Sequence, residues 1–284
     1  SPLGTGPNLA MMDYLLDEKI PVISPHSGTS RWANPLKRTY FALQPSYEIE
    51  GRILAQYVVE DLKPERIAVF SVDDPYGREG SAAFIAELSK AGIEPVAHIQ
   101  HQSGESAPHA WLAQLAELEV DLVLLYTYVK PSADLLRAAL EADYHPQWLG
   151  SYVISGPDLF QFAGVEATHG VRATGYPAGP RDHRGERLYR KTMSRLYPNE
   201  TPGSHSRIGY AAAQLVVEGL RLAGSDLTRE GFIQALESLE DWTGGLLPPI
   251  HYSPNDHRGL TALALQRAIN GRWVVEKGCL QLED

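Results

Sequence analysis

Two loops near the start of the chain combine glycine with hydroxyl residues, a combination that suits anion binding. The first loop, Gly4-Thr5-Gly6, runs directly into a helical pattern of apolar residues that begins at Leu9. Such a helix start exposes backbone N–H groups and the positive end of the helix dipole. The anion would be a nucleotide phosphate or a substrate carboxylate, and helix capping without a ligand is the third alternative. A nucleotide is disfavoured because Leu9 replaces the third glycine of G-x-G-x-x-G, and no P-loop Gly-Lys-Ser/Thr follows.

The second loop carries His26, Ser27, Gly28 and Thr29 and directly follows an expected strand over residues 19–24. Ligands of open α/β sheets bind beyond the carboxyl ends of the strands. Small hydroxyl residues and a glycine let backbone N–H groups approach an anion at such a place. A polar surface turn without a ligand is the alternative interpretation.

Three later strands are each followed by a tyrosine, and these residues are Tyr76, Tyr128 and Tyr152. Successive strand ends would deliver the three side chains to one edge of the sheet. Tyrosine combines an apolar face with a polar tip, which suits an enclosed small organic ligand. Tyrosines that only cap a sheet edge are the alternative.

No group of residues has the spacing of a catalytic or metal site. Asp73 and Asp74 are adjacent, so their side chains are expected to point apart and to cap a strand end rather than form an acid–base pair or bind metal. A zinc site in the turn-rich loop around His251 and His257 is the metal alternative. The chain has no G-x-S-x-G elbow, and Cys279 has no evident histidine partner in the sequence. We expect no catalytic residue, no metal and no cofactor.

The elements that position these residues alternate between strands and helices. Helices are expected from the first loop, after Ser46, after the Asp-Asp-Pro turn, and over residues 107–118 and 131–142. Strands are expected over residues 19–24, 67–72, 93–99, 121–126 and 147–150. This order and the apolar strands predict an α/β fold with a parallel sheet covered on both faces.

The second half of the chain has a different pattern. Three helices are expected over residues 184–196, 206–223 and 228–239, and a Gly- and Pro-rich loop follows. Two alternating strands, residues 261–268 and 272–277, flank Asn270-Gly271, the strongest short hairpin signal.

Composition excludes several classes of partner. A net charge of −10 over 284 residues argues against nucleic acid and anionic membrane surfaces. No apolar run approaches the roughly 20 residues of a membrane-spanning helix, so no membrane insertion is expected. No signal peptide is visible in this chain, and a trimmed mature protein would look the same.

Linkers that contain Gly or Pro suggest two lobes with three crossings between them. The first lobe is expected to comprise residues 1–45 plus 175–247, and the second residues 46–174 plus 248–284. The first lobe then has three late helices but only one clear strand. Either an N-terminal portion is missing or that lobe is built differently.

Four segments, taken in order, resemble the type I periplasmic solute-binding proteins of the branched-chain amino acid transporter group. They read GTGPNLAMMDYLLDEKIPVISPHSGTS, YFALQPSYEIEGRILAQYVVEDLKPERIAVFSVDDPYGREG, DLVLLYTYVKPSADLLRAAL and GLLPPIHYSPNDHRGLTALALQRAINGRWVV. The resemblance spans nearly the whole chain. It implies a two-lobed type I periplasmic binding protein fold, with parallel sheets flanked by helices, three interlobe crossovers and a first lobe incomplete at its N-terminus.

The resemblance also implies a function and a set of contacts. A non-enzymatic protein would capture a small carboxylate-bearing ligand between its lobes by hinge closure, in the periplasm or another extracytoplasmic space, and present it to the membrane permease of an ABC transporter. The ligand's carboxylate would be held by Gly4, Thr5, His26, Ser27, Gly28 and Thr29, and its other end by Tyr76, Tyr128 and Tyr152.

Tyr152 departs from the family pattern, because amino-acid-binding members usually carry a carboxylate there for the ligand's ammonium. A tyrosine cannot supply that charge near neutral pH. The ligand is therefore an aromatic or aliphatic acid without an amine, or an amino acid whose ammonium is met by another acid such as Asp73 or Asp74. A ligand-sensing module of the same fold and, less favoured, a cytosolic nucleotide-using enzyme are the rival functions.

Overall fold

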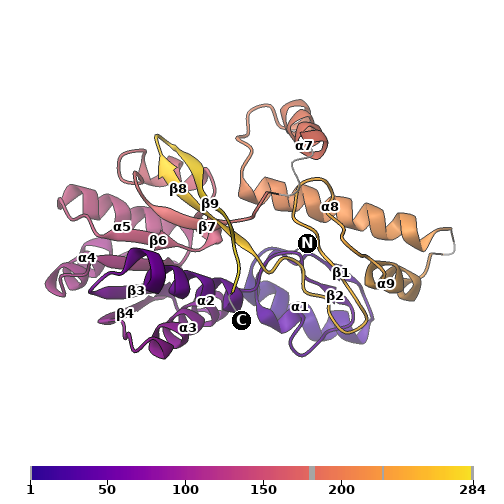
Figure 1. Ribbon diagram of the computed structural model, residues 1–284, viewed down its shortest axis with the longest axis horizontal. Helices are drawn as coiled ribbons and strands as arrows, with labels where there is room; N and C mark the ends of the chain where they lie inside the picture. The colour runs from indigo at the N-terminus through magenta and orange to yellow at the C-terminus, as the bar shows by residue number, and fades with distance from the viewer. Residues whose placement is uncertain (1, 179–182, 226, 283–284) are drawn as a thin grey trace. The chain divides into compact units, whose positions relative to one another are not determined.

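The computed structural model describes residues 2–178, 183–225 and 227–282. The chain divides into two units, which are coloured along the sequence in Figure 1. The first unit comprises Ser1–Ser46 and Tyr176–Ala262, and the second comprises Tyr47–Gly175 and Leu263–Asp284. The chain therefore crosses from one unit to the other three times. None of the helices within the described ranges is long and apolar enough to span a bilayer.

The second unit is built on a seven-stranded sheet with the order β4-β3-β5-β6-β7-β8-β9. Its strands are β3 (Ile67–Val72), β4 (Ala97–His101), β5 (Leu122–Tyr126), β6 (Gln147–Gly150), β7 (Arg172–Gly175), β8 (Leu263–Ile269) and β9 (Arg272–Leu280). The strands from β4 to β7 are parallel, and β8 and β9 add antiparallel at the edge. Every residue of β3 and β5 is buried, which explains why both read as continuous apolar runs in the sequence.

Helices cover this sheet (Figure 1). They are α2 (Tyr47–Tyr57), α3 (Pro75–Lys90), α4 (Pro108–Glu117), α5 (Val129–Glu141) and α6 (Asp158–Ala163), with a π-helical turn η2 (Val58–Leu62) and a 3₁₀ turn η3 (Tyr152–Ile154). α4, α5 and α6 pack on the face that carries Ala68 and Phe70. α2 and α3 pack against each other outside that cluster. The expected α/β architecture is confirmed for this unit.

The hairpin and the edge strands can be compared with the elements expected from the sequence. Asn270 and Gly271 have φ of 51° and 73°, the left-handed pair that a two-residue hairpin requires, so the expected hairpin is confirmed. The strand expected over residues 93–99 is instead Ala97–His101, because pairing with β3 begins at Ala97. β7 and α6 were not expected from the sequence.

The first unit contains a two-stranded parallel sheet, β1 (Val22–Ile23) and β2 (Tyr40–Phe41). Its helices are α1 (Thr5–Asp17), α7 (His183–Leu196), α8 (Ser204–Ala223) and α9 (Arg229–Glu237), with a 3₁₀ turn η1 (Ser30–Trp32). Leu9, Met12 and Leu16 of α1 pack against a cluster formed by Val22, Trp32 and Tyr40. The apolar face expected for this helix is therefore confirmed.

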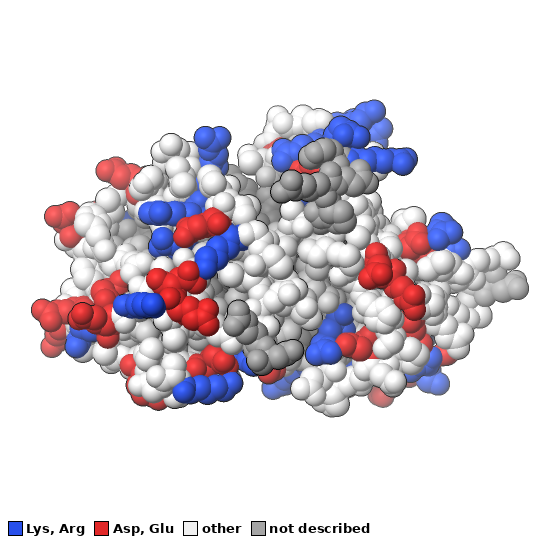
Figure 2. Space-filling model, in the orientation of Figure 1, with Lys and Arg blue, Asp and Glu red and all other residues white. Residues whose placement is uncertain are grey.

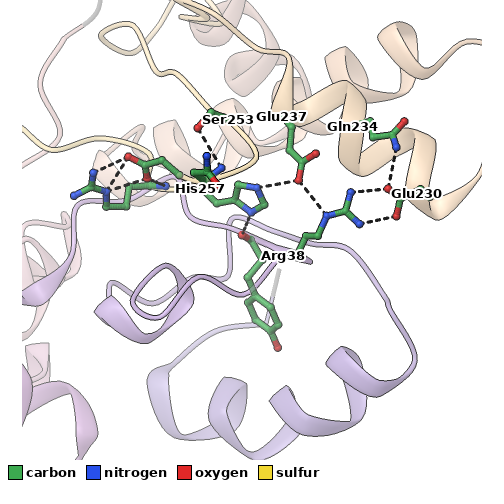
Figure 3. A network of polar contacts seen from close by, with 10 residues as sticks. Arg38, Glu230, Gln234, Glu237, Ser253 and His257 are labelled. Atoms are coloured by element: carbon green, nitrogen blue, oxygen red, sulfur yellow. Dashed lines mark hydrogen bonds and ion pairs between the residues drawn. The ribbon is translucent and has the colours of Figure 1, made fainter.

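Residues 248–262 lie in the first unit, whereas the sequence placed them in the second lobe. The reason is a set of contacts with the segment around β2. Ala42 N–H donates to the His257 carbonyl at 3.0 Å, and the His257 ring is fully buried. Figure 3 shows this ring beside Glu237, which in turn lies beside Arg38. These polar contacts connect segments that are about two hundred positions apart, so no local pattern in the sequence reveals them.

Candidate functional site

The structure brings the two predicted anion loops together within the first unit. Gly4 N–H donates to the His26 carbonyl at 3.1 Å, and His26 N–H donates to the Pro2 carbonyl at 3.0 Å. Gly4 has φ of 94°, a left-handed value that favours glycine, and directly precedes α1. The loops therefore run side by side at the start of this helix.

Two hydroxyl groups meet where the loops adjoin. The Thr5 and Ser27 hydroxyl oxygens are 2.8 Å apart, and both residues are buried. Trp32 Nε1 donates to the Ser27 carbonyl at 2.9 Å, which fixes the backbone of the second loop. Gly28 and Thr29 continue the same buried stretch. Five of the six residues predicted for this loop pair therefore lie at or next to the hydroxyl pair: Gly4 (through its backbone), Thr5, Ser27, Gly28 and Thr29.

Asn8 also belongs to this arrangement and was missed in the sequence. Its side-chain amide donates to the carbonyls of Pro2 at 2.9 Å and Gly4 at 2.7 Å, and the residue is almost fully buried. Asn8 lies one helical turn after Thr5 on the same face of α1. A polar residue at that spacing beside an apolar stripe is the signal that could have identified it.

The His26 side chain lies elsewhere. It lines a mainly apolar cavity of about 760 Å³ within the first unit, together with Ser24, Ala212 and Phe232. Its ring centroid is 5.6 Å from that of His205. Burial, reinforced by the neighbouring His205, lowers the pKa of His26 to about 4, so the ring is neutral at pH 7. His26 therefore contributes backbone to the loop pair and no positive charge for a carboxylate.

The three predicted tyrosines converge in the second unit, at the carboxyl ends of its strands. Tyr76 and Tyr128 have ring centroids 5.5 Å apart, and Tyr47 lies 4.8 Å from Tyr76 and 5.8 Å from Tyr152. Tyr126, at the end of β5, is 5.0 Å from Tyr76. We call these five residues the tyrosine cluster. Burial raises the pKa of both Tyr76 and Tyr128, so both phenols stay protonated and uncharged.

Glu50 of α2 lies fully buried beside this cluster and was not identified in the sequence. Its carboxylate accepts hydrogen bonds from Tyr126 Oη at 2.5 Å, Ser151 Oγ at 2.9 Å, the Tyr152 N–H at 2.8 Å and the Thr174 hydroxyl. The four donors come from the ends of β5, β6 and β7. Burial raises the pKa of Glu50, and the hydrogen bonds oppose that rise. An acid within the buried stripe of an expected helix was the available signal.

The adjacent aspartates point in different directions, as expected. Asp74 caps α3 by accepting from the Gly77 N–H at 2.9 Å, and its other oxygen accepts from Tyr128 Oη at 2.6 Å. Asp73 instead pairs with Arg78 at 2.7 Å, and the hydrogen bond from Arg78 lowers its pKa. Asp74 is therefore linked to the tyrosine cluster, whereas Asp73 is engaged elsewhere. Among the described residues, no group of three His, Cys, Asp or Glu side chains is placed to hold a metal ion.

Comparison with known proteins matches the family described as periplasmic binding protein over residues 1–272. The Leu/Ile/Val/Thr-binding protein of Salmonella typhimurium is 29% identical over 126 residues, which is 44% of this chain and 34% of the relative. The chain thus spans about a third of the length of such relatives in these matches.

Two solved structures show the same fold. A branched-chain amino acid ABC transporter protein from Thermus thermophilus, with bound valine, has a TM-score of 0.87 at 23% identity and covers 99% of this chain and 77% of its own. A fatty acid ABC transporter substrate-binding protein from Thermomonospora curvata also has a TM-score of 0.87, at 21% identity, over 99% of this chain and 74% of its own. The predicted type I periplasmic binding protein fold is confirmed.

Proposed function

Because the chain belongs to the periplasmic binding protein family, we propose that it captures a small carboxylate-bearing solute, an amino acid or an aromatic or aliphatic acid. The solute would pass to the membrane permease of an ABC transporter from an extracytoplasmic compartment. The expectation of a binding protein rather than an enzyme agrees with this family.

The observation that carries the proposal is the hydroxyl pair of Thr5 and Ser27. Each hydroxyl has the other as its partner at 2.8 Å, and Thr5 opens α1, where backbone N–H groups have no helical acceptor. A carboxylate has two oxygens and about four lone pairs, so it can accept from both hydroxyls and from a helix N-terminus together. Hydrogen bonds to a charged acceptor are stronger than the neutral one they would replace.

The relatives support a carboxylate as the common feature of the ligand. One structure contains valine, and another protein is named for fatty acid transport. These molecules differ in amine and chain length but share a carboxylate. We propose that the loop pair of the first unit binds this shared group.

Thermal unfolding with a ligand series tests the proposal. The probes are leucine, 4-methylpentanoate and phenylacetate, and leucinamide is the matched control that keeps the amine but lacks the carboxylate. An acid present at about 100 times its Kd stabilises the folded protein by about 2.7 kcal/mol. We expect at least one acid to raise the melting temperature and leucinamide to leave it unchanged. A series in which no carboxylate raises the melting temperature rejects the proposal.

A further inference from the structure

We propose that the outer face of helix α7 adsorbs the protein onto an anionic lipid bilayer. α7 spans His183–Leu196 and carries five Lys and Arg residues but a single acid, Glu186. Four of the cations recur at helical spacing, and we call them the basic stripe: Arg184, Arg187, Lys191 and Arg195. The inference goes beyond the proposed function, because it concerns a surface for the membrane rather than for the solute.

The packing of α7 turns the basic stripe outward. Tyr189 and Met193 lie on the opposite side of the helix, and both are buried. The Tyr189 ring centroid is 5.5 Å from that of Tyr210 in α8, and its hydroxyl oxygen is 2.6 Å from Ser206 Oγ. Every residue of the stripe is exposed. Figure 2 accordingly shows Lys and Arg side chains gathered where Figure 1 places α7.

The protein does not neutralise these cations itself. The side chains of the last three cations of the stripe form no ion pair or hydrogen bond with the residues that the structure describes. Glu186, the single acid of α7, instead pairs with Arg190 at 2.6 Å and with Arg207 at 2.7 Å. Long side chains without a partner are not fixed in one geometry, so they suit a partner whose anions can move to meet them.

The net charge of the whole chain argues against an anionic surface, but the excess of acid is not shared evenly. The first unit has fourteen Lys and Arg and thirteen Asp and Glu, whereas the second has eleven and twenty-two, which together make the 25 and 35 of the chain. The unit that carries α7 is therefore almost neutral. Surface charges act over about 8 Å at physiological ionic strength, so the local charge of α7 governs what binds there.

Apolar side chains beside the basic stripe favour a bilayer over an acidic protein. Leu188 lies within the stripe, four positions after Arg184 and three before Lys191, and is 50% exposed. Tyr197, directly after the helix, is also exposed. In a bilayer, anionic headgroups lie directly over hydrocarbon, so cations and apolar side chains are accommodated together, and tyrosine is enriched at that interface. Mobile lipids can also gather around cations that have no fixed geometry.

Flotation with lipid vesicles tests the inference on the intact chain and requires no solute, so its outcome is independent of the proposed function. One set of vesicles is phosphatidylcholine alone, and the other contains about one third phosphatidylglycerol. The stripe variant carries three substitutions, Arg187→Gln, Lys191→Gln and Arg195→Gln. The matched control removes the same charge from three exposed cations outside α7, by Arg31→Gln, Lys63→Gln and Arg272→Gln.

We expect the wild type to float with the anionic vesicles at about 0.1 M salt and to be released at about 1 M salt, where screening shortens the reach of charges to about 3 Å. It should not float with phosphatidylcholine alone. The stripe variant should bind the anionic vesicles about a hundredfold more weakly, and the control should stay within about threefold of the wild type. Both variants should melt at the wild-type temperature.

An equal loss of binding in the two triple variants would show that net charge governs binding and would overturn the inference. A wild type that binds neither kind of vesicle, or both kinds equally, would overturn it as well. Binding to polyglutamate but not to vesicles would assign the basic stripe to an acidic protein surface instead. If the stripe variant does not fold, the single substitution Lys191→Gln replaces it, with an expected loss of about fivefold; unchanged binding in that variant would reject the stripe.

Discussion

Among the residues that the structure describes, each unit buries one glutamate, and the surroundings of the two differ. Glu50 of the second unit accepts four hydrogen bonds and meets no cation among the described residues. Glu237 of the first unit lies 3.5 Å from Arg38 Nε and 3.4 Å from His257 Nε2, yet its Oε1 accepts no hydrogen bond from the described residues (Figure 3). One acid has hydrogen bonds without a nearby cation, and the other has a nearby cation but no hydrogen bond to its Oε1.

This difference separates two ways in which a protein holds a buried acid. The charge of Glu237 is balanced inside its own unit by Arg38, so it helps to hold residues 248–262 and α9 together. The charge of Glu50 is not balanced, and its donors are the groups that shape the tyrosine cluster. Burial alone would rank the two residues together, whereas charge balance tells them apart. In Figure 2 many charged side chains lie at the surface, some of them with acidic and basic groups side by side.

The largest expected effect comes from a substitution that displaces Tyr126, one of the donors to Glu50. A Cβ atom on Gly80 would lie 1.8 Å from Tyr126 Cζ. Gly80→Ala must therefore displace the ring whose hydroxyl donates to Glu50. We expect the free energy of unfolding to fall by about 2–3 kcal/mol, as for other overpacked cores. Urea unfolding measures this effect.

Gly209→Ala is the control for that substitution. Gly209 lies within α8 and a Cβ there would meet no atom within 4 Å. Alanine is the better helix former, so this variant should gain about 0.5–1 kcal/mol. If Gly80→Ala were as stable as the wild type, the close packing of Tyr126 over Gly80 would not describe the protein.

The next effect is an opposite response of the two units to acid. The pKa of His26 falls from 6.5 to about 4 on folding, so the unfolded chain binds the proton first as the pH drops. Stability contributed by this site is present above pH 6.5 and is lost toward pH 4, by on the order of 2 kcal/mol between about pH 7 and pH 5. The pKa of Glu50 is raised, so its contribution has the opposite sign and is lost as the pH rises through its folded pKa.

Hydrogen exchange of peptides from each unit measures this difference. Peptides around α1 and α8 should lose protection on acidification in the wild type and less so in His26→Leu. His109→Leu, at an exposed position of α4, should behave as the wild type. An equal pH response in His26→Leu and the wild type would contradict the assignment to His26.

The sequence predicted the parts of the fold that depend on neighbouring residues. The apolar run of β3, the Asn270-Gly271 turn and the face of α1 are each specified within about a dozen positions. The convergence of Tyr76, Tyr128 and Tyr152 also followed from a general rule, because parallel strands end at one sheet edge. The role of each predicted site residue in ligand binding stays a prediction.

The parts that the sequence did not reveal depend on distant partners or on side-chain direction. The donors to Glu50 are 76 to 124 positions away along the chain, so its network has no local signature. Residues 248–262 were misplaced because their contacts with the β2 segment are even more distant, at 210 to 217 positions along the chain. His26 and Ser27 are neighbours in one loop, yet only Ser27 meets Thr5, and composition alone does not decide which of two neighbours faces inward.

A smaller effect is expected at the loop pair of the first unit. Thr5→Val removes one hydroxyl of the loop pair at constant shape. We expect affinity for leucine and for 4-methylpentanoate to fall by about tenfold each, since both share the carboxylate, with their ratio unchanged. Thr39→Val is the matched control in the same unit, because the Thr39 hydroxyl is buried without a hydrogen-bond partner among the described residues. A change in the ratio for Thr5→Val would mean that Thr5 does not bind the shared group.

The smallest effect concerns Glu237 itself. Glu237→Gln keeps an oxygen near His257 and removes only the attraction to Arg38, whose guanidinium still pairs with exposed Glu230 at 2.5 Å. We expect a loss of about 1 kcal/mol or less in urea unfolding, and Glu230→Gln should be indistinguishable from the wild type. Neither variant should alter the ratio of leucine to 4-methylpentanoate affinity. A loss of several kcal/mol in Glu237→Gln would mean that its pair with Arg38 behaves as a buried ion pair rather than as a half-exposed one.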